Sequence, residues 1–317
     1  MKAKSLRPLF YLVWLVLAAG PAFAESRIEK TLKLEPGGDF RLETDIGRVS
    51  VTGTSSSGVR LVVTSRRDDL NDLLSFRYEE GARSASVIAR KKHHLDFLFG
   101  SWSSSVRFEV EVPAETAVTV HTSGGGISLA ALRSPAKIET SGGGIEVRDL
   151  VGDLLAETSG GSIHLRDIKG QSNVETSGGG IEAVNLEGSL KAETSGGSVN
   201  LDRVTGDIRA HSSGGGIHIR EAGGRVEADT SGGSIEATFA RGNARGGSLE
   251  SSGGGISVSL DPGVGLSIDA HGNSVSSDLP LTVQGEMSRG SLRGKLGGGG
   301  ESLRLRTSGG SVRIRAL

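Results

Sequence analysis

One short phrase recurs through the middle of this chain at a constant interval. It reads Thr-Ser-Gly-Gly, then Gly or Ser, then Ile or Val, and with minor changes its successive copies lie 18 residues apart. A fixed period this short indicates one small structural unit stacked on copies of itself. The repeat therefore predicts the architecture before any other feature is considered. The glycine pairs open at Gly124, Gly142, Gly160, Gly178, Gly196, Gly214 and Gly232.

Apolar residues recur at fixed places when the first glycine of each pair is counted as position 1. In the first copy they are Ile127, Leu129 and Leu132 at positions 4, 6 and 9, and Ile138 at position 15. Positions 4 to 6 and 13 to 17 alternate with a period of two, which is typical of β-strands. The alternation breaks near positions 8 to 11 and again at the glycine pair. Each copy is therefore expected to hold two short strands and two corners.

These patterns predict an all-β chain that forms a β-solenoid, similar to a β-helix. A helix is excluded because two or three glycines per copy, at about 1 kcal/mol each, would outweigh any helical gain. The expected coil has 18 residues, although position 3 alternates between Gly and Ser after the first copy, which leaves a 36-residue coil with unlike halves open. We expect each coil to add a rise of about 4.8 Å.

Two residue types are expected to hold the coils in place. Glycine is expected at the corners because the backbone there must turn through positive φ. Threonine at position 17 is expected to pass hydrogen bonds along the stack. These threonines are Thr140, Thr158, Thr176, Thr194 and Thr230.

The N-terminus has the pattern of a secretory signal peptide. Lys2, Lys4 and Arg7 precede the apolar run 9–19, and Ala-Phe-Ala at 22–24 is a small-x-small cleavage site. An uncleaved anchor is the alternative, but the run is shorter than the roughly 20 residues that a spanning helix needs. The expected division is a signal peptide at 1–24, an irregular β region and cap at 25–121, the regular repeats at 122–260, and degenerate terminal coils at 261–317.

Composition narrows the class of protein. The chain has 317 residues, 50 glycines, no cysteine and a formal net charge of −1. A chain with a net charge near zero has no overall positive potential that would attract nucleic acid. An exported chain without cysteine gains no stability from disulfides. We therefore predict no nucleic-acid partner, and no transmembrane span after the signal is removed.

Two polar columns are the candidates for chemistry. Position 16 carries Glu139, Glu157, Glu175 and Glu193, then His211 and Asp229. Stacked carboxylates could bind a hard cation. The expected state is instead a solvated face, on which lysines two positions earlier offset the negative charge. Position 8 carries Asp149, Asp167 and Asn185, with Arg148 and Arg166 beside the aspartates, where a polysaccharide-cleaving enzyme would place its acids. No metal site, cofactor or catalytic residue is predicted.

Two segments are the candidates for binding. Phe97, Phe99 and Trp102 form an aromatic segment flanked by Lys and His, which would dock on a partner or plug the first coil. The C-terminal segment is basic and carries Arg304, Arg306, Arg313 and Arg315 in alternating pairs, which would meet anionic polymers or block edge pairing of an exposed strand.

The order of elements resembles a known family. Phe-Glu-Val-Glu-Val-Pro at 108–113 leads into Thr-Ser-Gly-Gly-Gly-Ile at 122–127 and then into serial Ser-Gly-Gly-x-Ile coils. This order is similar to the bacterial putative-adhesin family, domain of unknown function 4097. The resemblance implies a secreted or envelope β-solenoid and supplies no catalytic residues.

The expected function is therefore binding or scaffolding by an exported protein. We predict a non-enzymatic β-solenoid in the periplasm, in the cell envelope or outside the cell, acting as an adhesin or scaffold on an envelope polymer, a glycan or a protein. The alternative is a carbohydrate-active enzyme that uses the column of Asp149 and Asp167.

Overall fold

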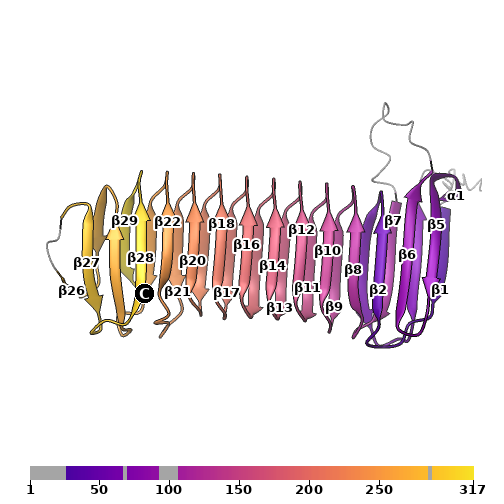
Figure 1. Cartoon of the computed structure of the whole chain (residues 1–317), viewed down its shortest axis with the longest axis horizontal. Helices are drawn as coiled ribbons and strands as arrows, with labels where there is room; N and C mark the ends of the chain where they lie inside the picture. Colours follow the sequence, from indigo (N-terminus) through magenta and orange to yellow (C-terminus); the bar gives the residue numbers. More distant parts are fainter. Residues whose placement is uncertain (1–25, 67–69, 93–105, 285–287) are drawn as a thin grey trace, which may run out of the picture.

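The chain forms one long stack of β-coils (Figure 1). The computed structural model describes residues 26–66, 70–92, 106–284 and 288–317. Their strands make a 14-stranded sheet and a 15-stranded sheet, and one short helix, α1 (Leu70–Leu73), lies near the N-terminal end. The all-β solenoid predicted from the repeat is confirmed.

Each repeat gives one strand to each sheet. In the 14-stranded sheet these are β9 (Ile127–Leu132), β11 (Ile145–Val151), β13 (Ile163–Lys169), β15 (Ile181–Glu187), β17 (Val199–Val204), β19 (Ile217–Ala222), β21 (Ile235–Phe239) and β23 (Ile256–Leu260). In the 15-stranded sheet they are β8 (Ala117–Thr122), β10 (Ala136–Thr140), β12 (Leu154–Thr158), β14 (Ser172–Thr176), β16 (Leu190–Thr194), β18 (Ile208–Ser212), β20 (Val226–Thr230) and β22 (Gly247–Ser251).

Pairing registers settle the length of the coil. Ile145 pairs in parallel with Ile163, and Glu139 pairs with Glu157, so equivalent residues 18 positions apart lie side by side in both sheets. The 36-residue alternative is therefore wrong. Position 3 accepts either Gly or Ser because a serine there has room and a use: the Ser162 hydroxyl accepts a hydrogen bond from the Gly180 N–H at 3.3 Å.

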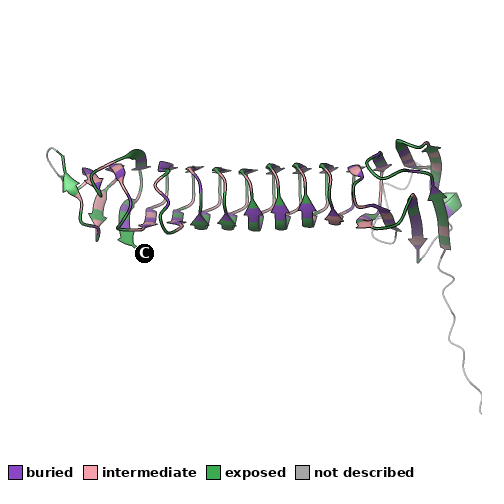
Figure 2. Cartoon of the chain, turned by 90° about the horizontal axis from the view of Figure 1, so that it is seen from below, coloured by how far each residue is buried: buried purple, intermediate pink, exposed green. Residues whose placement is uncertain are grey.

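The core is a narrow apolar layer between the two sheets. Ile163, Leu165 and Ile168 enter it from one sheet, and Leu154 and Ala156 enter it from the other, all at most 3% exposed. Figure 2 shows this alternation of buried and exposed residues along the regular coils. Since fully burying one large aliphatic side chain contributes roughly 1.5–3 kcal/mol, the repeated apolar columns are the main source of stability.

Glycine has two different roles at the corners. The expectation of positive φ holds at position 11 for Gly152, Gly170 and Gly188, but not for Gly206 or Gly224, and it is wrong for the glycine pair. At the second glycine of the pair the requirement is close approach: a Cβ on Gly161 would lie 2.2 Å from the Gly143 carbonyl oxygen of the preceding coil. The remaining left-handed corner, position 8, is occupied by residues other than glycine, including Asp149 and Asp167 with φ of 49° and 56°.

The predicted threonine ladder is confirmed. Thr158 Oγ1 donates to the Gly143 carbonyl of the preceding coil at 2.7 Å and accepts from the Gly161 N–H of its own coil at 3.3 Å. Thr176 repeats both contacts one coil on. Each buried hydroxyl therefore fastens two adjacent glycine corners together.

The N-terminal end stacks its strands out of sequence order. From the regular block outward, the coil of β2 and β3 comes first, then the coil of β6 and β7, and then β5 and β4 close the two sheets in antiparallel fashion, with β1 outside β4. The bounds are β1 (Ser26–Leu32), β2 (Asp39–Thr44), β3 (Arg48–Thr54), β4 (Val59–Ser65), β5 (Leu74–Glu80), β6 (Ser84–Lys91) and β7 (Val106–Pro113).

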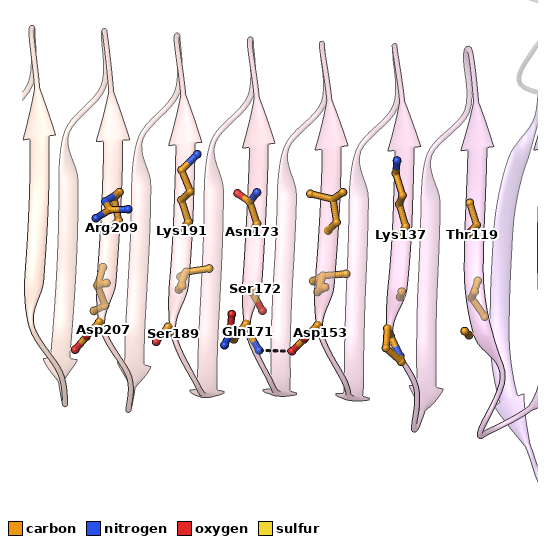
Figure 3. A pocket seen from close by; sticks show the side chains of 18 of the residues that line it. Thr119, Lys137, Asp153, Gln171, Ser172, Asn173, Ser189, Lys191, Asp207 and Arg209 are labelled. Carbon is orange, nitrogen blue, oxygen red and sulfur yellow. Dashed lines mark hydrogen bonds between the residues drawn. The ribbon is translucent and has the colours of Figure 1, made fainter. Parts of the chain in front are cut away.

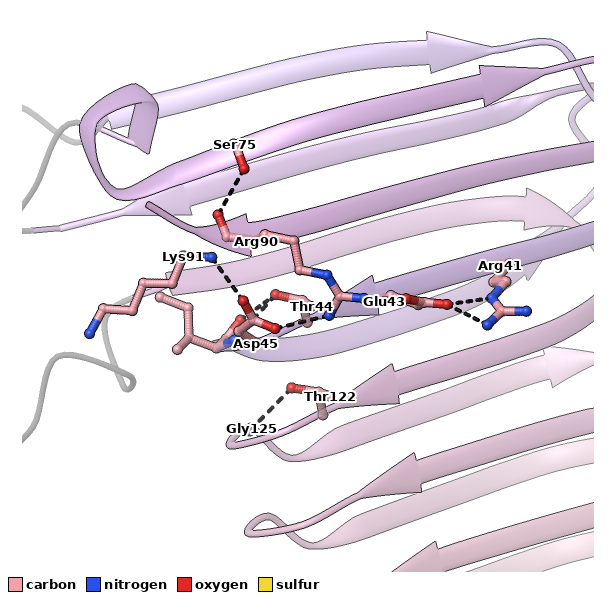
Figure 4. Close-up of polar contacts among 10 residues, drawn as sticks. Arg41, Glu43, Thr44, Asp45, Ser75, Arg90, Lys91, Thr122 and Gly125 are labelled. Carbon is pink, nitrogen blue, oxygen red and sulfur yellow. Dashed lines mark hydrogen bonds and ion pairs between the residues drawn. The ribbon is translucent and has the colours of Figure 1, made fainter. Parts of the chain in front are cut away.

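A polar cluster joins β2 to its neighbour β6 (Figure 4). The Arg90 guanidinium on β6 contacts Glu43 on β2 and donates to Asp45 Oδ1 at 2.9 Å. Asp45 Oδ2 also accepts from the Lys91 N–H at 2.9 Å, and Arg41 Nε donates to Glu43 at 2.7 Å. The charges are used within the cluster, so its role is to join β2 and β6.

The C-terminal end also stacks out of order. The last coil in the sequence, formed by β28 and β29, lies inside the stack, between the coil of β22 and β23 and the coil of β24 and β25. Antiparallel β27 and β26 then close the 15-stranded sheet. The bounds are β24 (Leu266–His271), β25 (Ser274–Ser277), β26 (Thr282–Val283), β27 (Ser291–Leu296), β28 (Glu301–Thr307) and β29 (Ser311–Ala316).

Candidate functional site

A groove follows the stack along the outer face of the 15-stranded sheet (Figure 3). It runs between two rows of side chains, at positions 12 and 14 of successive coils, and its volume is about 680 Å³. From Thr119 to Glu227 the groove crosses six coil steps, which is roughly 29 Å at about 4.8 Å per step. We call it the repeat groove. Its rows are Pro135, Asp153, Gln171, Ser189, Asp207 and Arg225 on one side, and Thr119, Lys137, Leu155, Asn173, Lys191, Arg209 and Glu227 on the other.

Backbone hydrogen bonds hold the first row of the repeat groove. Asp153 Oδ1 accepts from the Gln171 N–H, and Asp207 Oδ1 accepts from the Arg225 N–H, each at 2.9 Å. Both aspartates therefore link the corner of their own coil to the corner of the next. This use of the carboxylates makes the row rigid.

Ion pairs hold the second row. Lys137 Nζ lies 2.8 Å from Glu139 Oε1, and Lys191 Nζ lies 2.9 Å from Glu193 Oε1. The hydrogen bond and charge of Lys137 lower the pKa of Glu139, and the same contact raises the pKa of Lys137. The lining carries charges of both signs in nearly equal number and exposes more apolar than polar surface, which suits an extended ligand with both apolar and polar groups, held by many weak contacts.

The position-16 carboxylates are stacked as expected. Glu139, Glu157, Glu175 and Glu193 pair in register across four neighbouring strands. Lys137 and Lys191 reach into this column from position 14. Within residues 26–66, 70–92, 106–284 and 288–317, no three His, Asp or Glu side chains are grouped to hold a metal ion.

The position-8 aspartates lie on the opposite corner, in a hollow of about 670 Å³. Asp149 pairs with Arg133 at 3.1 Å, while Asp167 Oδ1 accepts from Asn185 Nδ2 at 2.8 Å, and Arg203 Nε donates to Asn185 Oδ1 at 2.6 Å. Each carboxylate thus has its own polar partner. Arg148, which we expected to accompany Asp149, instead pairs with Glu146 at 2.7 Å.

The four C-terminal arginines do not form one patch. Arg304 and Arg306 lie on β28 and face outward from the 15-stranded sheet, whereas Arg313 and Arg315 lie on β29 and face outward from the 14-stranded sheet. The edge-blocking interpretation is wrong, because β28 and β29 each have a neighbouring strand on both sides. Charge on such strands protects no open edge.

Two further cations join the first pair of arginines. Arg293 and Lys295 lie on β27, two strands from β28. Their alternation in the sequence shows that they share a face, but only the stacking order shows that this is the face of Arg304 and Arg306. Sequence reasoning therefore missed them as partners.

Two predicted features lie outside the described residues. They are the signal peptide at 1–24 and the aromatic residues Phe97, Phe99 and Trp102. Within the part of the chain that the structure describes, no helix is long and apolar enough to cross a membrane.

Comparison with solved structures finds distant likenesses. A putative adhesin from Bacteroides fragilis is 12% identical, with 94% of this chain and 99% of that chain covered and a TM-score of 0.35. A putative lipid binding protein from Parabacteroides distasonis is 15% identical, with 92% and 97% covered and a TM-score of 0.35. A putative cell adhesion protein from Clostridium sporogenes is 11% identical, with 92% and 100% covered and a TM-score of 0.28. We draw nothing about function from these likenesses.

The family is shown by the sequence itself. No curated protein matches the chain. Residues 75–315 match the family described as Toastrack DUF4097, which confirms the resemblance seen in the serial Ser-Gly-Gly-x-Ile coils. Since the match spans most of the chain, this protein belongs to the Toastrack DUF4097 family.

Proposed function

We propose that this protein is an exported, non-enzymatic adhesin or scaffold that presents a rigid, repetitive surface to an extended polymer of the cell envelope or to a glycan. The observation that carries the proposal is the repeat groove, which crosses the regular coils from Thr119 to Glu227 without interruption. A ligand with its own repeating units would meet a groove of constant backbone spacing, whose side chains are polar, charged or apolar from coil to coil. Many weak contacts of this kind add up along one polymer.

The location is part of the same proposal. The basic, apolar and small-residue pattern of 1–24 supports export, to the periplasm, the cell envelope or the outside of the cell. The aromatic segment with Phe97, Phe99 and Trp102 is proposed as a second contact for the partner.

The test is a screen of the purified protein on glycans and envelope polymers that records both retention and release of cleaved sugar. We expect retention without cleavage. Leu155→Arg together with Asn173→Arg puts bulk and charge into the repeat groove and should weaken retention by about tenfold or more, which is about 1.4 kcal/mol. Val184→Arg with Asn200→Arg, on the outer face of the other sheet, is the matched control and should have little effect.

Other outcomes would redirect the proposal. Cleavage that Asp149→Asn or Asp167→Asn abolishes would replace it with the enzyme. Retention lost on changing Phe97, Phe99 and Trp102, but not on filling the repeat groove, would assign binding to the aromatic segment. No retention on any polymer would reject a binding role for these surfaces.

A further inference from the structure

Four cations gather on the outer face of the 15-stranded sheet near its C-terminal end. We call Arg293, Lys295, Arg304 and Arg306 the cationic patch. Asp269 on β24 is its centre, because Asp269 pairs in register with Arg304 on one side and with Arg293 on the other. In the neighbouring rows Ser267 pairs with Lys295, and His271 pairs with Arg306.

The patch departs from the charge pattern of the regular coils. There Lys137 and Lys191 at position 14 pair with Glu139 and Glu193 at position 16, whereas Arg209 pairs with Glu227 of the next coil. In the last coil Arg304 occupies position 14, since it pairs with Ser248, and position 16 is itself a cation, Arg306. The sign of the position-16 column thus reverses at this coil.

Few acids compensate the patch. Asp269 is only 22% exposed and is shared by His271 at 3.0 Å, Arg293 at 3.6 Å and Arg306 at 3.8 Å. Among the described residues, no carboxylate lies within 4.0 Å of the charged nitrogens of Arg304 or Lys295. Outside the patch, Glu250 lies in register beside Arg306, and its carboxylate accepts the Ser248 hydroxyl at 3.0 Å. The patch is therefore strongly positive.

The fold uses these charges only in part, since Arg293 and Arg306 pair with Asp269. Like charges side by side on a sheet are destabilising. Protection of an open edge would explain Arg304 and Arg306, but β28 lies between β22 and β24. A binding role remains as the reason for placing four cations around a single acid.

We propose that the cationic patch binds the acidic groups of an anionic polysaccharide, that is, carboxylates, sulfates or phosphates carried along a polar chain. This inference rests on the proposed function and names its ligand class. Arg304 and Arg306 are about 7 Å apart along β28, and Arg304 and Arg293 are about 10 Å apart across β24. These are spacings of the backbone, and a polymer with several acidic groups can contact more of the four cations than one small anion can.

The surroundings of the patch favour a polysaccharide over a membrane. Ser291 and Ser302 lie beside the cations and offer hydroxyls to a sugar chain, whereas the Ser267 hydroxyl is bonded to the Gly300 backbone. A membrane surface would need several apolar anchors beside the charges. Near the patch the described residues supply one exposed large apolar side chain, Val283 on the neighbouring strand β26.

The test measures binding of the full chain to immobilised polygalacturonate and dextran sulfate, with neutral dextran as the uncharged control. Binding to both acidic polymers is expected, and it should weaken as salt rises from about 0.05 M to about 0.5 M, because screening shortens the reach of the charges. Arg304→Gln with Arg306→Gln should weaken it by about tenfold, as should Arg293→Gln with Lys295→Gln. Asp269→Asn should strengthen it by roughly twofold to fivefold.

The matched control removes the same charge from the same coil. Arg313→Gln with Arg315→Gln lies on the opposite sheet and should leave binding within about twofold. Equal loss in this control and in the patch variants would overturn the patch in favour of a net-charge effect. Retention that falls only on filling the repeat groove would overturn the patch and keep the proposed function. Binding to phosphatidylglycerol vesicles but to neither acidic polymer would replace the polysaccharide with a membrane.

Discussion

The second glycine of each pair offers a sharp test of how the coils stack. A Cβ on Gly161 would lie 2.2 Å from Gly143 O and 2.4 Å from Gly144 N, all backbone atoms that no side-chain rotation can move. A Cβ on the adjacent Gly160 would lie 3.3 Å from Gly142 O, which a small shift accommodates. Neither glycine has a φ in the left-handed region. The two alanine variants therefore differ in steric fit and in little else.

The structure sets the expected cost of Gly161→Ala. Relieving the contact requires the two coils to separate by about 1 Å at this corner, beyond the range of good hydrogen bonds. The bonds at risk are Thr158 Oγ1 to Gly143 O at 2.7 Å and Ile145 N to Ser162 O at 2.9 Å. At about 1 kcal/mol each, with about 1–3 kcal/mol for overpacking, the loss is about 3–5 kcal/mol. Gly160→Ala should stay within about 1 kcal/mol of the parent, because alanine also restricts the unfolded chain.

Thermal unfolding followed by circular dichroism distinguishes the two variants. For a chain of this size about 1 kcal/mol moves Tm by about 2 °C, so Gly161→Ala should lower Tm by about 6–10 °C and Gly160→Ala by no more than about 2 °C. Equal Tm values for the two variants would refute close approach as the reason for the second glycine. Glycine would then be needed there for conformational freedom or for no structural reason.

Four further predictions concern the core, the ladder, pH and the last coil. Ile163→Asp should unfold the stack, because an unpaired buried charge costs several kcal/mol; an unchanged Tm would contradict the burial of position 4. Thr176→Val leaves a glycine carbonyl and a glycine N–H unsatisfied and should cost about 1–3 kcal/mol in denaturant unfolding. The contact with Lys137 lowers the pKa of Glu139 in the folded state. The pair therefore stabilises the fold at pH values above the unfolded pKa of Glu139, and this stabilisation is lost as pH falls through the folded pKa. Glu139→Gln should make Tm fall slightly less steeply in acid, by an amount that corresponds to no more than about 1 kcal/mol. Amides of β28 should exchange with solvent more slowly than those of β26, although β28 lies nearer the end of the chain; the reverse order would contradict its place inside the stack.

The regular coils were predictable because their information is local. The apolar columns at positions 4, 6, 9, 13 and 15, the strand pair and the threonine ladder all follow from which residues repeat every 18 positions. The backbone conformation at position 8 was not predictable, because no local sequence pattern indicates that Asp149 and Asp167 adopt left-handed backbone conformations. The need for glycine at Gly161 was predictable, but its reason was not, since the clash lies with the preceding coil.

The candidate sites were less predictable for the same reason. The row with Lys137 and Lys191 is visible in the sequence. The repeat groove also requires the other row, which contains Asp153 and Asp207, to lie opposite it at the starts of the strands. The pairing of Arg293 with Arg304 depends on β24 lying between their strands. No repeat phrase marks that order.

By itself the sequence determined the family, the all-β class, the 18-residue repeat and the inward columns, because stacked copies must satisfy the same contacts at every step. The pairing registers then showed that one coil holds one repeat and not two. Only the tertiary structure decided how the two ends are closed and which charges meet. At both ends a later segment enters the stack beside an earlier one. Antiparallel strands close both sheets at the N-terminal end, and they close the 15-stranded sheet at the C-terminal end. Such insertions depend on complementary edges far apart in the chain, and a local pattern carries no record of its distant neighbour.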